Sequence, residues 1–177
     1  MTDLQPAIPA AAHIGHVHLK VADLDRAVDF YRRGLGFELV NRFGNQAAFL
    51  SAGGYHHHIG LNTWESQGGA PPPPGSTGLY HFAINYPERR DLAAALKRLL
   101  DYGWGIDGAS DHGTHEAIYL HDPDGNGIEL AWDRDPALWR RGGEIIFDRK
   151  TLDWASLMAE LDDTAPDEVL AGLARFR

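Results

Sequence analysis

One pattern of expected elements, strand–helix–strand–strand–strand, occurs twice in this chain of 177 residues. In each copy an alternating segment precedes a helix with apolar residues at helical spacing, and three short strands separated by turn residues follow. A unit of this size cannot enclose a core alone, so the repeat predicts two modules that pack together. The expected fold class is α+β, in which two βαβββ modules form curved mixed sheets around a pocket, followed by a C-terminal helical tail.

The domain boundaries follow from changes in composition. Residues 67–78 contain four consecutive prolines and several glycines, which predicts a stiff linker between the modules. The tail is charged at first and then carries amphipathic helices, the last starting at Thr164 and Pro166, so we expect it to be structural. The expected divisions are a loose N-terminus at 1–12, a two-module domain at 13–134 (first module 13–66, linker 67–78, second module 79–134) and an extension at 135–177.

The individual elements are expected as follows. The two helices begin at the capping residues Asp23 and Asp91 and end at Gly34 and Gly103. The strands are expected at 14–21, 37–41, 46–50 and 55–64 in the first module and at 79–85, 104–106, 116–120 and 127–132 in the second.

The segment 121–130 predicts a β-hairpin, because Asp-Pro-Asp-Gly followed by Asn-Gly is a dense turn signal between two apolar runs. In its second strand Ile128 and Leu130 share one face and Glu129 lies on the other. A Glu in this position either faces water or is a carboxylate metal ligand inside a cupped sheet, because burial without a partner is costly.

The histidines distinguish these two interpretations of Glu129. The chain has ten of them; His16 lies in the first strand of the first module, and His81 opens the equivalent strand of the second. Two imidazoles and one carboxylate facing one cavity form a 2-His-1-carboxylate triad, which is typical of non-haem Fe(II) chemistry with O2. Imidazole also binds Mn, Ni or Zn, so the ligands indicate the reaction better than they indicate the metal.

Other polar side chains are expected near this cavity. If residues 55–64 form a strand, parity places His57 opposite His56 and His58, and the tract is either a surface cluster or a source of an acid–base histidine. Tyr119 is either a core tyrosine or a hydrogen-bond donor to a substrate. His18 is expected either to point into the pocket or to be exposed. His112 and His115 lie in the stretch that leads to Glu129, and Asp111 and Glu116 are expected to face solvent.

The composition excludes several classes of partner and site. A net charge of −9 argues against binding to nucleic acid or to an anionic membrane. The absence of cysteine excludes disulfides and thiolate sites, and the N-terminal segment lacks the pattern of a signal peptide. We therefore expect a cytoplasmic protein with a small-molecule substrate, and the apolar stripes of the tail suggest a homodimer or a higher homo-oligomer.

Two motifs carry a resemblance to a known family. The first runs from His16-Val17-His18-Leu19-Lys20-Val21 to Gly34-Leu35-Gly36-Phe37, and the second from Asp122 to Leu130. The chain resembles the vicinal oxygen chelate superfamily, which contains glyoxalase I, bleomycin-resistance proteins and type I extradiol dioxygenases. Segments 55–64, 79–83 and 110–120 are most similar to the catechol 2,3-dioxygenase branch.

This resemblance implies roles for individual residues. The metal ligands of the branch carry over to His16, His81 and Glu129, and the metal to Fe(II), with Mn, Ni or Zn as alternatives. The acid–base histidine falls on His57 or His58. Two further active-site residues fall on Tyr119 and His112. The implied reaction is extradiol ring cleavage of a catechol-type aromatic substrate with O2, although members of this branch commonly contain four units and this chain has two.

Two other functions within the superfamily remain open. A glyoxalase-type isomerase or lyase usually requires a second carboxylate ligand in the last strand of the first module, where this chain has His and Gly. A bleomycin-resistance-like protein binds its ligand without a metal, and the His-His-Glu set would then have no role. Metal content and oxygen uptake with a catechol distinguish these alternatives from a dioxygenase.

Overall fold

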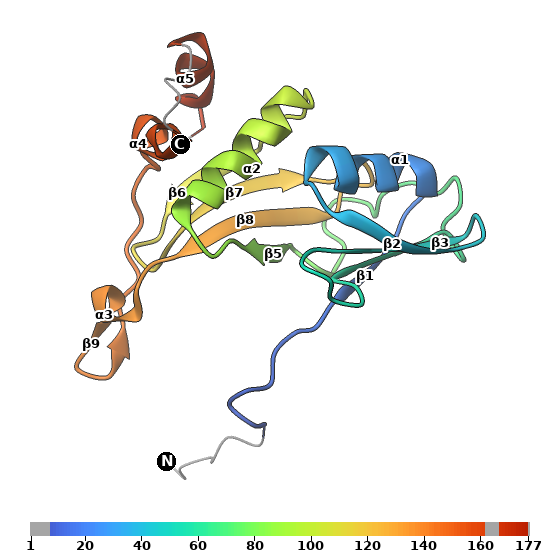
Figure 1. Cartoon of the computed structure of the whole chain (residues 1–177), viewed down its shortest axis with the longest axis horizontal. Coiled ribbons are helices and arrows are strands. Elements are labelled where there is room, and N and C mark those ends of the chain that lie inside the picture. Colours follow the sequence, from blue (N-terminus) through green and yellow to red (C-terminus); the bar gives the residue numbers. More distant parts are fainter. Residues whose placement is uncertain (1–7, 162–166, 177) are drawn as a thin grey trace.

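The computed structural model describes residues 8–161 and 167–176. Two four-stranded mixed sheets lie next to each other, and helices cover one side of both (Figure 1). The expected α+β class and the repeated βαβββ order are confirmed. The expectations for residues 1–7 and for a helix start at Thr164 and Pro166 lie outside the described residues.

The first sheet has the strand order β1-β4-β3-β2, with β1 parallel to β4. Asp23 caps the helix as expected by accepting a hydrogen bond from the Arg26 amide, but the last turn of this helix is π-helical. The bounds are β1 Val17–Lys20, α1 Leu24–Asp29, the π-helical turn Phe30–Gly34, β2 Glu38–Phe43, β3 Ala47–Ser51 and β4 Ile59–Asn62.

The strand expected at 55–64 is shorter than predicted, because residues 55–58 form a bend. Gly53 and Gly54 both have positive φ, so the chain turns sharply before it reaches the sheet. His58 makes the first contacts with the sheet, through its amide to Leu50 O and its carbonyl to Val17 N, and regular pairing begins at Ile59. Strand parity therefore does not apply to the three histidines.

The second sheet repeats this arrangement in the order β5-β8-β7-β6, with β5 parallel to β8. Two expectations are wrong. The helix begins at Arg89 and not at Asp91, because the Asp91 amide already bonds to the carbonyl of Glu88. Residues 104–106 are not a strand, because the Trp104 amide still bonds to the Leu99 carbonyl of that helix. The bounds are β5 Phe82–Asn85, α2 Arg89–Asp101, β6 Gly108–Asp111, β7 His115–His121 and β8 Gly127–Asp133.

The extension contains more structure than the loop expected at its start. A short helix and a small hairpin form an arm away from the sheets, and two further helices lie beyond α2 (Figure 1). Trp154, Leu157 and Met158 are buried, as their spacing predicted. The bounds are α3 Pro136–Trp139, β9 Arg140–Arg141, β10 Glu144–Ile145, α4 Trp154–Met158, a 3-10 turn Ala159–Leu161 and α5 Asp167–Leu173.

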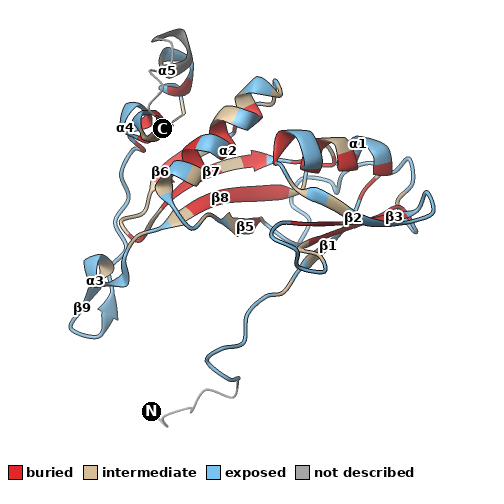
Figure 2. Cartoon of the chain, viewed as in Figure 1, coloured by how far each residue is buried: buried red, intermediate tan, exposed pale blue. Residues whose placement is uncertain are grey.

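The core lies between the sheets and their helices, as Figure 2 shows by the buried inner strands and helix faces. The turn of the hairpin at 121–130 joins the modules, because its carboxylates reach the first module. The Tyr31 hydroxyl, which is fully buried, donates to Asp122 Oδ2 at 3.0 Å, and Arg26 Nη2 donates to Asp124 Oδ1 at 2.7 Å. The Asp-Pro-Asp-Gly sequence thus makes a turn and fixes one module on the other.

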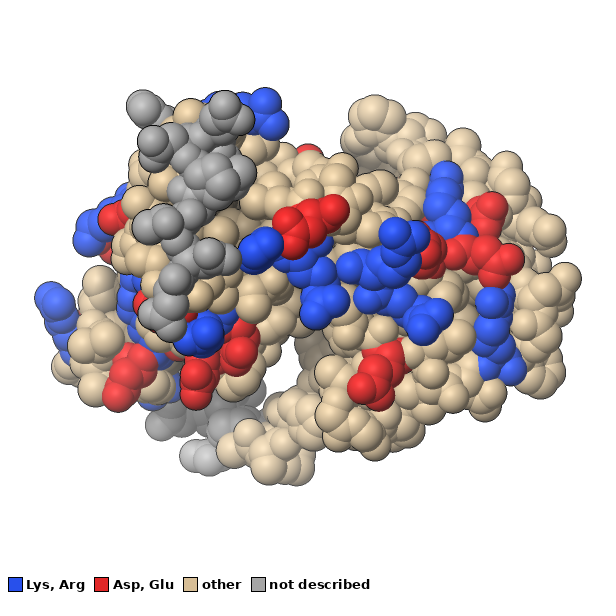
Figure 3. All heavy atoms as spheres, turned by 45° about the horizontal axis from the view of Figure 1, so that its top comes forward, with Lys and Arg blue, Asp and Glu red and all other residues tan. Residues whose placement is uncertain are grey.

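The face toward the viewer in Figure 3 carries basic and acidic side chains side by side. The exposed ion pairs of the chain include Arg33 with Asp29 and Lys97 with Asp101. Among the described residues, no helix has the length and apolar character needed to cross a bilayer.

Candidate metal and catalytic site

A cavity of about 780 Å³ lies between the modules. Its lining includes His16 beside β1, His58 before β4 and His81 immediately before β5. Most of the other lining residues are apolar or glycine, and they come from both modules. A concave, mostly apolar surface with a few polar groups is the usual form of a small-molecule site.

Glu129 is the centre of the polar cluster in the second module. It lies on β8 opposite Ala83 on one side and Tyr119 on the other, and it is only 6% exposed. Its Oε2 is 2.8 Å from His81 Nε2, and its Oε1 is 3.1 Å from His115 Nε2. Burial alone would raise the pKa of Glu129, but the hydrogen bond to His115 and the surrounding histidines outweigh it and lower the pKa. The carboxylate is therefore ionised at neutral pH.

A second pair, His112 and Tyr119, lies beside this carboxylate. His112 Nε2 is 2.9 Å from the Tyr119 hydroxyl, and the His112 ring stacks on His115 with centroids 4.7 Å apart. Burial and the neighbouring Glu129 charge raise the pKa of Tyr119 to about 12. Burial and the proximity of His115 lower the pKa of His112. At neutral pH the phenol thus keeps its proton and the His112 imidazole is uncharged.

The histidines of the first module form a more exposed cluster. The ring centroids of His16 and His57 are 4.4 Å apart, and His56 Nδ1 is 2.8 Å from His57 Nδ1. Burial and the nearby His16 and His56 lower the pKa of His57. His58 is held separately, with its Nδ1 3.1 Å from Ser51 Oγ and accepting from the Ala52 amide.

The expected metal ligands are brought together only in part. His81 and Glu129 are in contact, whereas His16 lies on the wall of the same cavity with its ring against His57. Within the part of the chain that the structure describes, no three His, Asp or Glu side chains form a group that could hold a metal ion. The donor chemistry of two imidazoles and one ionised carboxylate nevertheless fits a divalent first-row metal.

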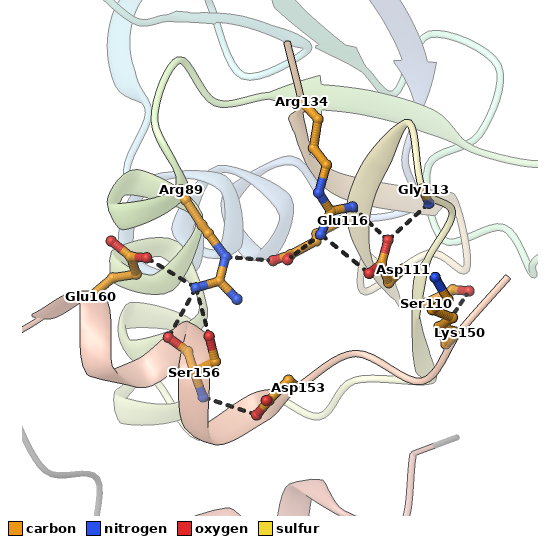
Figure 4. A network of polar contacts seen from close by, with 10 residues as sticks. All are labelled: Arg89, Ser110, Asp111, Gly113, Glu116, Arg134, Lys150, Asp153, Ser156 and Glu160. Carbon is orange, nitrogen blue, oxygen red and sulfur yellow. Dashed lines mark hydrogen bonds and ion pairs between the residues drawn. The ribbon is translucent and has the colours of Figure 1, made fainter. Parts of the chain in front are cut away.

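Sequence reasoning missed the contact of His115 with Glu129. On β7, residues 115, 117 and 119 share one face, so the side expected for Tyr119 also implied the side of His115. The expectation that Glu116 faces solvent is wrong, since it is 4% exposed on the opposite face. Figure 4 shows the reason: Arg89 Nε lies 2.9 Å and Arg134 Nη2 2.8 Å from its carboxylate.

Residues 13–130 match the family model described as the Glyoxalase/Bleomycin resistance protein/Dioxygenase superfamily. A catechol-2,3-dioxygenase of Bacillus subtilis is 36% identical over 90% of this chain and 57% of its own length. A biphenyl-2,3-diol 1,2-dioxygenase of Rhodococcus globerulus is 32% identical over 68% of this chain and 63% of its own length. The chain therefore spans about three fifths of the length of these relatives.

Solved structures with a similar fold are matched over almost their whole length. A lactoylglutathione lyase of Agrobacterium tumefaciens has a TM-score of 0.54 and 22% identity, covering 71% of this chain and 96% of its own. A glyoxalase/dioxygenase of Nostoc punctiforme has a TM-score of 0.59 and 19% identity, covering 74% of this chain and 99% of its own. At these sequence identities the similarity shows the fold alone.

Proposed function

Because the chain belongs to the glyoxalase/bleomycin resistance protein/dioxygenase superfamily, we propose that it is a metal-dependent extradiol dioxygenase that cleaves a catechol-type aromatic ring with O2. The observation that carries this proposal is the contact of His81 Nε2 with the buried, ionised carboxylate of Glu129 beside a cavity that His16 also lines. The similarity to dioxygenases of aromatic diols supports the same substrate class.

His16, His81 and Glu129 would hold the metal, for which Fe(II) is our first assignment and Mn, Ni or Zn are the alternatives. When bound, such a metal supplies two effects: it lowers the pKa of a coordinated phenol and holds the substrate in place for O2. The apolar lining of the cavity from both modules suits an aromatic ring.

Proton handling is assigned to histidines and a tyrosine of this chain. His58 lines the cavity, and because its Nδ1 accepts from the Ala52 amide, the proton of the neutral ring is on Nε2 and available to a bound substrate. In the tautomer in which His112 Nε2 donates to the Tyr119 oxygen, the Tyr119 phenol, with its high pKa, is free to donate a hydrogen bond to a substrate oxygen, and uncharged His112 accepts a proton at Nδ1. Of the two histidines that the resemblance implies, we therefore favour His58 over His57.

The register of the sheets argues against the glyoxalase-type alternative. Val17 pairs with Ile59 in the first module, and Phe82 pairs with Ile128 in the second. The position that corresponds to Glu129 is thus Gly60, which has no side chain. A second carboxylate ligand at this position, which an isomerase of that type would use, is absent.

The test begins with elemental analysis of anaerobically purified protein, followed by an oxygen-electrode assay with catechols. We expect His81→Ala and Glu129→Ala to lose the metal, and His58→Gln to keep it while turnover falls by about 10²–10⁴-fold, the usual effect of removing a general acid or base. His57→Gln tests the other implied position and should keep turnover, and His121→Gln, which changes an exposed histidine that pairs with Asp107, is the matched control and should keep both metal and turnover. Wild-type protein that loads no divalent metal, or that loads it without consuming oxygen with any catechol, would refute the proposal.

A further inference from the structure

We infer that His115 is a positioning residue, which holds the carboxylate of Glu129 in the orientation that a metal requires; this inference rests on the proposed function. The two oxygens of Glu129 have different partners. Oε1 lies 3.1 Å from His115 Nε2, and Oε2 lies 2.8 Å from His81 Nε2. His115 thereby occupies one oxygen and leaves the other directed toward an expected metal ligand.

The other ring nitrogen of His115 contacts a hydroxyl group, which can donate to it or accept from it. Thr114 Oγ1 lies 2.8 Å from His115 Nδ1, and Thr114 is buried. When the Thr114 hydroxyl donates to Nδ1 of the neutral ring, the ring proton is on Nε2 and is donated to Glu129. Thr114, His115, Glu129 and His81 thus form one continuous chain of polar contacts.

The His115 ring is also held from the side and through its main chain. It stacks on His112 at an interplanar angle of 29°, and the His112 amide donates to the His115 carbonyl at 2.9 Å. The Asp148 amide of the extension donates to the His112 carbonyl at 2.9 Å, so the tail fixes the turn that precedes β7. A ring held in this way can fix the torsion of a carboxylate that would otherwise rotate.

A partner of this kind affects metal affinity without binding the metal. Groups that hydrogen-bond to metal ligands orient them, and their removal typically costs about 10–100-fold in affinity. Loss of a ligand itself costs far more, because the donor atom is removed. This difference in size separates a positioning role for His115 from a direct one.

The experiment measures the affinity of the full chain for Mn²⁺, from the free-ion signal in electron paramagnetic resonance. We expect His115→Leu to weaken binding by about 10–100-fold. His115→Gln should stay close to wild type, because its side-chain amide can donate to the same oxygen. The matched control is His121→Leu, which removes an exposed histidine of the same strand that pairs with Asp107 at 2.6 Å, and it should not change the affinity.

The outcomes separate this inference from the proposed function. Unchanged affinity in His115→Leu overturns the positioning role, and a loss as large as in His81→Ala overturns it in favour of a direct ligand. If His115→Leu does not fold, Thr114→Val decides, since it removes the contact to Nδ1: weaker binding supports the role and unchanged binding overturns it. A wild-type protein that binds neither Mn²⁺ nor Fe²⁺ better than Glu129→Ala does refutes the proposed function itself, whatever His115 does.

Discussion

The two modules pair their first and last strands in the same register. They differ in which of the two strands carries the large side chain at the position equivalent to Glu129. In the first module the large side chain is His18 on β1, and it faces Gly60 on β4. In the second the small residue is Ala83 on β5, and it faces Glu129 on β8. Each pair accommodates one polar side chain, and only the second provides a carboxylate. The difference explains how a repeated unit yields an asymmetric candidate site.

The modules also differ in what surrounds their polar groups. Glu129 is buried among partners, whereas His16 and His18 of the first module are exposed. Behind the second sheet, Glu116 is held between Arg89 and Arg134, and Arg89 also binds Ser156 and Glu160 of the extension (Figure 4). We conclude that the extension stabilises the second module and helps it carry buried charge.

Of the substitutions that compare the two modules, Arg89→Met should cause the largest loss in the free energy of unfolding. This change removes one of the two arginines that pair with the buried Glu116 carboxylate. Because Arg134 still compensates the charge, we expect a loss of about 3 kcal/mol, the lower end of the range for breaking a buried ion pair. The matched control is Arg33→Met in the first module, whose pair with Asp29 is exposed and should change stability by about 0.5 kcal/mol or less. Urea unfolding measures both. Equal losses in the two variants would show that the network adds nothing particular to the second module.

A smaller difference in the free energy of unfolding is expected between alanine substitutions at two glycines, one in the last strand of each module. At Gly127 a Cβ would overlap the backbone oxygen of Tyr80, which cannot move without displacing β5 and His81. Gly127→Ala should therefore cost about 1–3 kcal/mol. At Gly60 a Cβ would meet the His18 ring at 2.9 Å, and that ring is a flexible side chain that can turn away. Gly60→Ala should cost less in the same unfolding measurement; the reverse order would contradict the comparison.

The sequence was sufficient for features that depend on local patterns. The repeated βαβββ order, the hairpin at 121–130 and the buried stripe around Leu157 all follow from periodicity and turn residues, and the structure has them. The side of β8 on which Glu129 lies follows from alternation along one strand. These features require no knowledge of distant contacts.

The errors concern features set by distant partners. His56, His57 and His58 leave the strand because Gly53 and Gly54 turn the chain before pairing with β3 and β1 begins. Glu116 is buried because Arg89, 27 residues earlier, comes to it when α2 packs on the sheet. The contact of His115 with Glu129 depends on the register between β7 and β8, which alternation within a single strand does not give.

The smallest expected effect is a pH dependence that belongs to the second module. Burial would raise the pKa of Asp111, but its hydrogen bonds with Arg134 and with the Gly113 amide outweigh burial and lower the pKa below the ordinary value of 3.8. A carboxyl group with a lowered folded-state pKa contributes stability above its unfolded pKa and loses it as the pH falls through the folded value. Wild-type stability should therefore decline on acidification below pH 3.8, and Asp111→Asn should flatten that decline by about 1 kcal/mol.

The matched control is Asp25→Asn in the first module, where the carboxylate pairs with Arg42 but is 82% exposed, so its profile should run parallel to wild type. Urea unfolding at a series of pH values measures all three, and an Asp111→Asn profile parallel to wild type would mean that the lowered pKa does not contribute to stability.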